Sequence, residues 1–441
     1  MKVEKMKVIN PNAAGIDIGS RSHFVAIGQS EEEVEEFGVY SSDHRKMVTY
    51  LKSHNIETIA MESTGSYWQT LFFALQKENF EVLLVSGHQT KNVRAKTDVK
   101  DCQWIQKLHS LGLLRGCFLP GNETSRLRIL NRHRSSLVDE SSKMSNKMQK
   151  SMRMMNLRLD VVISDITGKS GIAIIEAILK GEKDGEKLAK LADSRVRKTK
   201  AEIADALQGQ WSDELLFELE DCYDLYKTLQ SKIQNCDKKL EALLIKFTQD
   251  SHHNIKDVSL EKKQMKGKNQ PKFKLNELSY RYYGVDLFAI EGVSVSTVLS
   301  LISEIGLDIH KFDTAKQFSS FLRLAPNNRV SGGKVISSRT PKGANKFALA
   351  LRNAANTIDN KRDGHLVAFF KRIAYKKGRG AAITATARKL AVIIWNMIIN
   401  QVPYQPLNDK MYKEKIKQKR IAVMKKMMKQ SDISTSELST I

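Results

Sequence analysis

The alternation of apolar and polar residues in the first quarter of the chain predicts short strands followed by helices. Short apolar runs bounded by glycine or polar residues are typical of strands. Such runs lie at residues 15–19, 23–27, 36–40, 58–61 and 82–85. Helical spacing of apolar residues follows at 43–54, after Gly65, and at 98–113. The order β-β-β-α-β-α-β-α predicts an α/β domain over residues 12–118.

The middle of the chain, residues 124–247, predicts long and highly charged helices. Its second half places apolar residues at alternating steps of three and four, the a/d seam of a coiled coil: Leu219, Cys222, Tyr226, Leu229, Ile233, Cys236, Leu240, Leu243 and Phe247. An earlier stretch, 127–155, follows the same frame but is interrupted by Arg134, Ser141 and Ser151. Two interpretations remain open. The two helices pack on each other within one chain, or the seam pairs two subunits.

The last third of the chain divides by composition. Lysines crowd around Gly267 and Pro271, which predicts a basic linker or insertion over residues 248–285. Residues 286–402 predict a second, mostly helical domain, and the lysine-rich residues 407–441 predict a disordered basic tail. Within the second domain, Glu291-Gly292 before an apolar helix resembles half of a helix-hairpin-helix, in which a glycine turn presents N–H groups to phosphate. An ordinary turn is the alternative.

Charge narrows the choice of partner. The chain has 72 Lys and Arg against 49 Asp and Glu, a formal net charge of +23. Such an excess attracts polyanions, above all nucleic acid, with an anionic membrane surface as the rival. No apolar run reads as long enough to span a bilayer, and the N-terminus lacks the apolar core of a signal peptide. We therefore expect a cytoplasmic protein without a membrane partner.

Four carboxylates fall where a metal site would need them. Asp17 lies within the first strand, Glu62 at the end of the fourth, and Asp98 and Asp101 open the last helix on one face. Hard cations need carboxylate oxygens, so Mg²⁺, with Mn²⁺ as the alternative, is the expected cofactor. Asp98 and Glu62 also suit helix capping. Asp17 is harder to explain structurally, because a carboxylate in an apolar strand costs free energy unless something satisfies it.

The stretch Gly15–Ser20 also resembles the phosphate-binding hairpin of actin-like ATPases and sugar kinases. Those folds need a second Asp-Gly phosphate loop and a glycine-rich adenosine motif. Neither is found at suitable spacing. The basic charge of the chain is also unexplained by a sugar kinase.

A candidate nucleophile lies in the second domain. Ser331 is followed by two glycines, which allow a phosphate to approach closely, and is flanked by cations that could hold it. The cations expected to contact nucleic acid are Arg329, Lys334, Arg339 and Lys342. Ser-Gly-Gly is also an ordinary turn. Ser337 and Ser338 are rival nucleophiles, and the residues alone do not decide among the three serines.

The motifs together resemble a known family. They are GIDIG (15–19), MESTG (61–65), KTDVKD (96–101), FSSFLRLAP (318–326), RVSGG (329–333), KG (342–343) and LRNAA (351–355). They are similar to motifs of the DEDD insertion-sequence transposases. The resemblance implies an RNase H-like, RuvC-like α/β N-terminal domain, a helical coiled-coil middle and a mainly α C-terminal transposase domain.

The resemblance also implies chemistry. Asp17, Glu62, Asp98 and Asp101 match the family's metal-binding carboxylates, and Ser331 matches its nucleophilic serine. Family members use a structured bridge RNA that pairs with donor and target DNA, which delegates sequence choice to base pairing. The expectation is a DNA recombinase acting as a homo-oligomer, a dimer or tetramer, on the nucleoid of a prokaryotic cell. The alternatives are a RuvC-like metal-dependent junction nuclease and a catalytically inactive nucleic-acid-binding scaffold.

Overall fold

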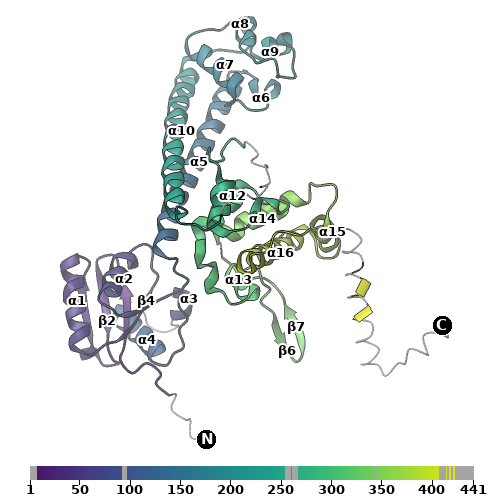
Figure 1. Cartoon of the computed structure of the whole chain (residues 1–441). Helices are drawn as coiled ribbons and strands as arrows, with labels where there is room; N and C mark the ends of the chain where they lie inside the picture. Colours follow the sequence, from purple (N-terminus) through teal and green to yellow (C-terminus); the bar gives the residue numbers. More distant parts are fainter. Residues whose placement is uncertain are drawn as a thin grey trace, which may run out of the picture. The chain divides into compact units, whose positions relative to one another are not determined.

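A computed structural model describes residues 7–91, 97–253, 260, 267–343 and 345–406, with 414, 417, 418, 421 and 422 of the tail. The chain forms two compact units, Met1–Leu119 and Pro120–Ile441 (Figure 1). Most of the basic tail predicted at 407–441, and most of the lysine-rich run before Gly267, lie outside the described residues.

The N-terminal unit contains a mixed five-stranded sheet in the order β3-β2-β1-β4-β5. Strand β1 pairs antiparallel with β2 and parallel with β4, and the outer pairs continue these directions. The strands are β1 (Ala13–Ile18), β2 (Ser22–Ala26), β3 (Val34–Gly38), β4 (Thr58–Glu62) and β5 (Glu81–Val85). The predicted α/β domain is confirmed. The third strand starts two residues earlier than predicted.

Helices flank this sheet. They are η1 (Glu31–Glu33), α1 (Ser41–Ser53), α2 (Trp68–Lys77), α3 (Gly87–Thr90) and α4 (Asp98–Ser110). The predicted helices correspond to α1, α2 and α4, whereas the one-turn helix α3 was not predicted. Helix α4 stops at Ser110, short of the predicted 113, because Gly112 turns the chain with a φ of +66°.

Helix α4 lies directly on β1, and Gly15 permits this contact. A Cβ atom on Gly15 would lie 2.2 Å from the backbone N of Gln106 and 2.5 Å from the carbonyl O of Cys102. Any side chain there would push the helix off the sheet. Gln106 also donates from Nε2 to the carbonyl of Ala13 at 3.2 Å. Glycine therefore sets the depth at which α4 packs.

Two long helices dominate the first part of the C-terminal unit. Helices α5 (Asn122–Met154) and α10 (Asp213–Phe247) pack side by side (Figure 1). Most residues of the predicted seam are buried: Leu219, Cys222, Tyr226, Ile233, Cys236 and Leu240. Packing within one chain is thus the arrangement observed, the first of the two interpretations.

The polar residues that interrupt the seam of α5 have polar partners on α10. Arg134 donates from Nε to Oδ1 of Asp237 at 2.5 Å, and both side chains are only 8% exposed. Arg134 also donates to the carbonyl of Asn269 at 3.0 Å. Two further pairs follow the same rule: Ser141 with Gln230 (2.7 Å) and Ser151 with Glu218 (3.0 Å). Polar partners at matched positions fix the register of the helix pair.

Short helices with a separate apolar core cap the far end of this pair (Figure 1). They are α6 (Leu159–Val162), α7 (Lys169–Leu179), α8 (Gly185–Lys190) and α9 (Lys200–Ala206).

The rest of the C-terminal unit is mainly helical, as predicted. Its elements are α11 (Leu275–Tyr283), η2 (Leu287–Ala289), α12 (Val295–Glu304), η3 (Gly306–Lys311), α13 (Ala315–Phe321), β6 (Arg329–Ser331), β7 (Lys334–Ser337), α14 (Lys346–Ile358), α15 (His365–Lys377) and α16 (Arg379–Asn400). A buried carboxylate fastens this part to α5. Glu304 accepts two hydrogen bonds from Arg132, both at 2.8 Å, while Arg128 donates to its carbonyl at 2.6 Å.

The C-terminal end of the predicted basic linker is folded. Helix α11 buries Leu275, Leu278, Tyr282 and Tyr283 in the core that it shares with α12, α14 and α16. The linker expectation at 248–285 therefore needs correction from Phe273 onward. The many lysines of this segment led to the linker prediction, although its large apolar residues have helical spacing.

Helix α16 corrects the expectation that no apolar run could span a bilayer. By length and composition this helix of 22 residues could cross a membrane, although half of its most apolar window is buried. Its apolar residues, including Leu390, Ile394 and Ile398, pack in the core. Burial explains its composition as that of a core helix.

Gly15→Ala tests the contact between α4 and β1. The added methyl overlaps backbone atoms, so the free energy of unfolding of the N-terminal unit should fall by about 1–3 kcal/mol. Urea denaturation followed by tryptophan fluorescence measures this. Gly380→Ala is the matched control, because a Cβ there meets no atom within 4 Å. Equal effects of the two variants would contradict the packing argument.

Arg134→Met tests the buried ion pair. It leaves Asp237 buried without its partner, which should cost about 3–5 kcal/mol. The double variant Arg134→Met/Asp237→Leu should cost less than Arg134→Met alone, because no uncompensated charge remains. Urea denaturation of wild type, Arg134→Met, Asp237→Leu and the double variant gives the coupling energy. Additive losses would show that the two residues stabilise the protein independently.

Candidate active site

The four predicted carboxylates of the N-terminal unit converge electrostatically on Asp17. Its side chain is half-buried on β1. Its pKa is raised from 3.8 to about 6, mainly by burial and then by the negative charges of Asp101, Asp98 and Glu62 in that order. The three residues come from β4 and α4, elements that are separate in sequence. The fold therefore gathers acidic side chains that would repel one another without a cation.

Glu62 is held by the unpredicted helix α3. Thr90 donates from Oγ1 to Oε2 of Glu62 at 2.5 Å, and a Cβ on Gly87 would lie 2.4 Å from Oε1. Both residues thus shape the position of the carboxylate. Sequence reasoning missed them, because Gly-x-x-Thr after a strand has no distinctive signature.

Asp98 and Asp101 occupy the first turn of α4, but neither caps it. The N-cap is Thr97, whose Oγ1 accepts from the backbone N of Lys100 at 3.3 Å. Asp98 is therefore not an N-cap, but its alternative interpretation as a first-turn acid that stabilises the helix is confirmed. Capping does not account for either carboxylate, although both favour the positive end of the helix dipole.

The donor chemistry of this cluster fits a hard divalent cation, since all four ligand candidates are carboxylates. Their mutual repulsion, visible in the pKa of Asp17, is the quantity that a bound cation would relieve. Within the described residues, however, no three His, Cys, Asp or Glu side chains lie close enough to hold a metal ion. The carboxylates share an electrostatic field but no formed coordination shell.

Ser331 belongs to the C-terminal unit and lies beside the turn of the β6–β7 hairpin. It pairs with Lys334 across the turn, and Gly332 and Gly333 have φ values of +53° and +74°. Positive φ at both turn positions requires residues such as glycine. A Cβ on either glycine would meet no atom within 4 Å, and Ser331 is exposed. The hairpin therefore displays this serine with open space around its turn.

The hairpin has two different faces. Alternation along the strands places Ser331, Arg329 and Lys334 on one face. Val330 and Val335 lie opposite each other on the other face, and each is 59% exposed. The serine thus lies between two predicted phosphate-binding cations.

The remaining predicted cations follow the hairpin. The backbone N of Asn327 donates to the carbonyl of Arg339 at 3.0 Å, and the guanidinium of Arg323 donates to the carbonyl of Lys342. The side chains of Arg339 and Lys342 are exposed. Of the two rival serines, Ser337 accepts a hydrogen bond from the backbone of Arg339 at 3.4 Å.

The glycine turn before α12 does not present an open surface. Gly292 has a φ of +81°, and its missing Cβ would lie 2.8 Å from the carbonyl O of Ala354 on α14. Glycine is needed there for packing on α14. The turn is therefore better explained as an ordinary one than as half of a helix-hairpin-helix.

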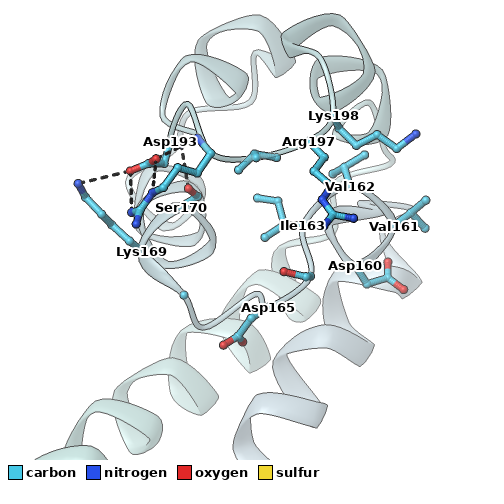
Figure 2. A pocket seen from close by; sticks show the side chains of 14 residues that line it. Asp160, Val161, Val162, Ile163, Asp165, Lys169, Ser170, Asp193, Arg197 and Lys198 are labelled. Atoms are coloured by element: carbon cyan, nitrogen blue, oxygen red, sulfur yellow. Dashed lines mark hydrogen bonds and ion pairs between the residues drawn. The ribbon is translucent and has the colours of Figure 1, made fainter. Parts of the chain in front are cut away.

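A cavity of about 730 Å³ lies among the short helices at the end of the long pair (Figure 2). Most of its charged lining residues take part in ion pairs. Asp193 pairs with Arg195 and Lys169, and Asp165 pairs with Lys268. Such internally paired charges do not indicate a ligand of either sign.

Two family models match the chain. A model described as "Transposase", of the DEDD type associated with IS110, matches residues 14–156. A second model, described as "Transposase IS116/IS110/IS902 family", matches residues 286–369. The first range contains the four carboxylates and the second contains the serine hairpin. By class, the chain thus belongs with the transposase families.

Similarity to a known protein points to the same family. The chain is 31% identical over 122 residues to the "Transposase for insertion sequence element IS1111A" of Coxiella burnetii (strain RSA 493 / Nine Mile phase I). The match covers 26% of this chain and 33% of that protein, about a third of its length. With both models, this shows that the chain belongs to the IS110 family of insertion-sequence transposases.

The raised pKa of Asp17 predicts a pH-dependent stability. Its pKa in the folded protein, about 6, exceeds the ordinary value of 3.8, so the folded state binds the proton more tightly. This stabilisation is complete below about pH 4 and is lost as the pH rises through 6. With a chelator present, Asp17→Asn should raise the free energy of unfolding above pH 6 by on the order of 1 kcal/mol, allowing for solvent screening.

Urea titrations from pH 3.5 to 8 measure this difference. The difference in free energy of unfolding between Asp17→Asn and wild type should vanish near the lowest pH of the series. Glu57→Gln is the control, since Glu57 lies on the same unit but is absent from the charges that act on Asp17. A difference that does not change with pH would contradict a shifted carboxyl group.

Proposed function

We propose that this protein cleaves and rejoins DNA strands to move an insertion sequence. The observation that carries the proposal is the convergence of Glu62, Asp98 and Asp101 on Asp17 in a chain of transposase family. The strand order and the parallel and antiparallel pairings are compatible with an RNase H-like, RuvC-like domain. In such a domain the carboxylates serve phosphoryl transfer.

Asp17, Glu62, Asp98 and Asp101 would hold Mg²⁺, or Mn²⁺. When bound, the cation would stabilise negative charge on the scissile phosphate. Thr90 and Gly87 keep Glu62 in place. Asp17 must be ionised to act as a ligand, and its raised pKa favours ionisation only above about pH 6.

Ser331 is the proposed nucleophile. Its Oγ forms a bond to phosphorus while the bond from phosphorus to the 3′ oxygen breaks, and the proton lost by the serine hydroxyl balances the one taken up by the released 3′ oxygen. The phosphoserine conserves the phosphoester, so attack by a 3′ hydroxyl of the exchanged strand reseals the DNA and frees Ser331. Arg329 and Lys334, on the same hairpin face, would hold the phosphate oxygens. Arg339 and Lys342 would bind the flanking backbone.

The carboxylates and the serine belong to different units of the chain. We propose that the protein works as a homo-oligomer, a dimer or tetramer, in which one subunit's serine serves the carboxylates of another. A bridge RNA would choose the donor and target DNA by base pairing, leaving the protein to bind backbones. This work would take place on the nucleoid of a prokaryotic cell.

The distribution of charge supports binding to nucleic acid backbones. Of 72 Lys and Arg and 49 Asp and Glu, residues 1–119 contain 14 of each. The whole net charge of +23 therefore lies in residues 120–441. The N-terminal unit is neutral overall, so the attraction for polyanions comes from the C-terminal unit.

Cleavage of supercoiled element-junction DNA tests the proposal. The protein is incubated with copurified RNA and Mg²⁺, and covalent protein–DNA adducts are measured. Wild type should form an adduct, whereas Ser331→Ala should reduce it at least about 10³-fold because the attacking oxygen is gone. Asp17→Asn should also abolish it. Ser338→Ala, a change to a nearby exposed serine, should leave it intact.

Nicks that persist in Ser331→Ala and vanish in Asp17→Asn would instead indicate a metal-dependent nuclease that uses water. Loss of the adduct in Ser338→Ala, with retention in Ser331→Ala, would assign the nucleophile to the other serine.

A further inference from the structure

The chain contains two long segments without carboxylates, and residues 364–408 form the second of them. No Asp or Glu occurs between Gly364 and Asn408. The same segment contains Lys371, Arg372, Lys376, Lys377, Arg379, Arg388 and Lys389. These residues lie outside the ranges matched by the two family models, which end at 156 and 369. Neither the acidic cluster nor the serine hairpin accounts for them.

The structure concentrates several of these cations at one corner. Helices α15 and α16 pack along each other and are joined through Gly378 (Figure 1). Their apolar faces are buried in the core, which leaves the opposite face of α15 in solvent. Lys371, Arg372, Lys376 and Lys377 are exposed there, and none forms an ion pair with another described residue.

The ring of Phe369 brings one of these cations close to a cation of α16. The Nζ atom of Lys389 on α16 lies 4.7 Å from the ring centroid of Phe369, and Cζ of Arg372 on α15 lies 5.5 Å from the same centroid. The two charges are therefore within about 10 Å of each other. Like charges this close repel, so a polyanion would relieve the repulsion.

An exposed aromatic residue lies among these lysines. The side chain of Tyr375 is 92% exposed and directly precedes Lys376 and Lys377. A Cβ on the nearby Gly378 or Gly380 would meet no atom within 4 Å, so the backbone of the turn is also accessible. Cations beside an accessible ring match the two parts of a nucleotide, the phosphate and the base.

We propose that the α15–α16 corner binds a single-stranded segment of nucleic acid. Lys371, Lys376 and Lys377 hold successive phosphates, and Tyr375 stacks on an unpaired base. Duplex binding needs only the cations, because paired bases hide their faces from an external ring. This inference rests on the proposed nucleic acid function but not on its serine chemistry. Both RNA and displaced DNA present the required chemistry.

Fluorescence anisotropy of the full-length protein tests the proposal. The probes are labelled dT20, rU20 and a 20-base-pair DNA duplex, each titrated at several salt concentrations. Tyr375→Ala should weaken binding of a single strand by about 5- to 150-fold and leave duplex binding unchanged. Tyr375→Phe should restore it, since stacking needs the ring and not the hydroxyl. The single strand more affected identifies the source, RNA or DNA.

Charge is tested by Lys376→Gln/Lys377→Gln. This variant should weaken single-strand binding and lower the slope of log affinity against log salt by about 1–2. The matched control is Lys238→Gln/Lys239→Gln, which removes two adjacent exposed lysines from α10. The control should bind as wild type does.

The proposal is overturned if Tyr375→Ala binds single strands normally, if it weakens single-strand and duplex binding equally, or if both lysine variants behave alike. The serine adduct assay tests the proposed function independently of this binding surface. An adduct that depends on Ser331, together with unaltered binding by the corner variants, would support the proposed function and contradict nucleic acid binding at the α15–α16 corner. Single-strand binding that depends on the corner residues, without any adduct, would support the corner as a binding surface and contradict the serine chemistry.

Discussion

The contact between α4 and β1 is the constraint on which the acidic site depends. At Gly15 the backbone of the helix lies where any side chain would be, so the helix is fixed at the minimum distance from the sheet. This depth brings the first turn of α4 close enough for its two carboxylates to act on Asp17. The packing energy of the helix thereby offsets the electrostatic cost of gathering like charges, which a divalent cation would then reduce.

The C-terminal unit treats charge in two opposite ways. Within the long helix pair, buried polar residues have polar partners on the facing helix, as Arg134 has Asp237. These pairs fix the register of the two helices. On the face of α15, exposed lysines beside Tyr375 form no ion pair with any other residue that the structure describes. Buried charge must be compensated inside the protein, whereas exposed charge is available to a partner. The contrast separates structural cations from those suited to bind nucleic acid.

Much of the fold could be predicted, because its elements follow simple periods. Short apolar runs located the strands to within two residues, and steps of three and four located the seam of α10. The helix α11 and the one-turn helix α3 escaped prediction. Lysines around α11 outweighed its apolar spacing, and α3 is too short to show any period. The contribution of Thr90 to the position of Glu62 was therefore invisible.

By itself, the sequence determined the residue types of the candidate site, the turn that requires Gly332 and Gly333, and the excess of positive charge. Those properties are local or additive, so they can be derived from the sequence without a structure. Only the tertiary structure decided that four carboxylates from separate elements share one electrostatic field, and that the seam of α10 is occupied by α5 of the same chain. Distances between segments remote in sequence depend on packing, which no local pattern encodes.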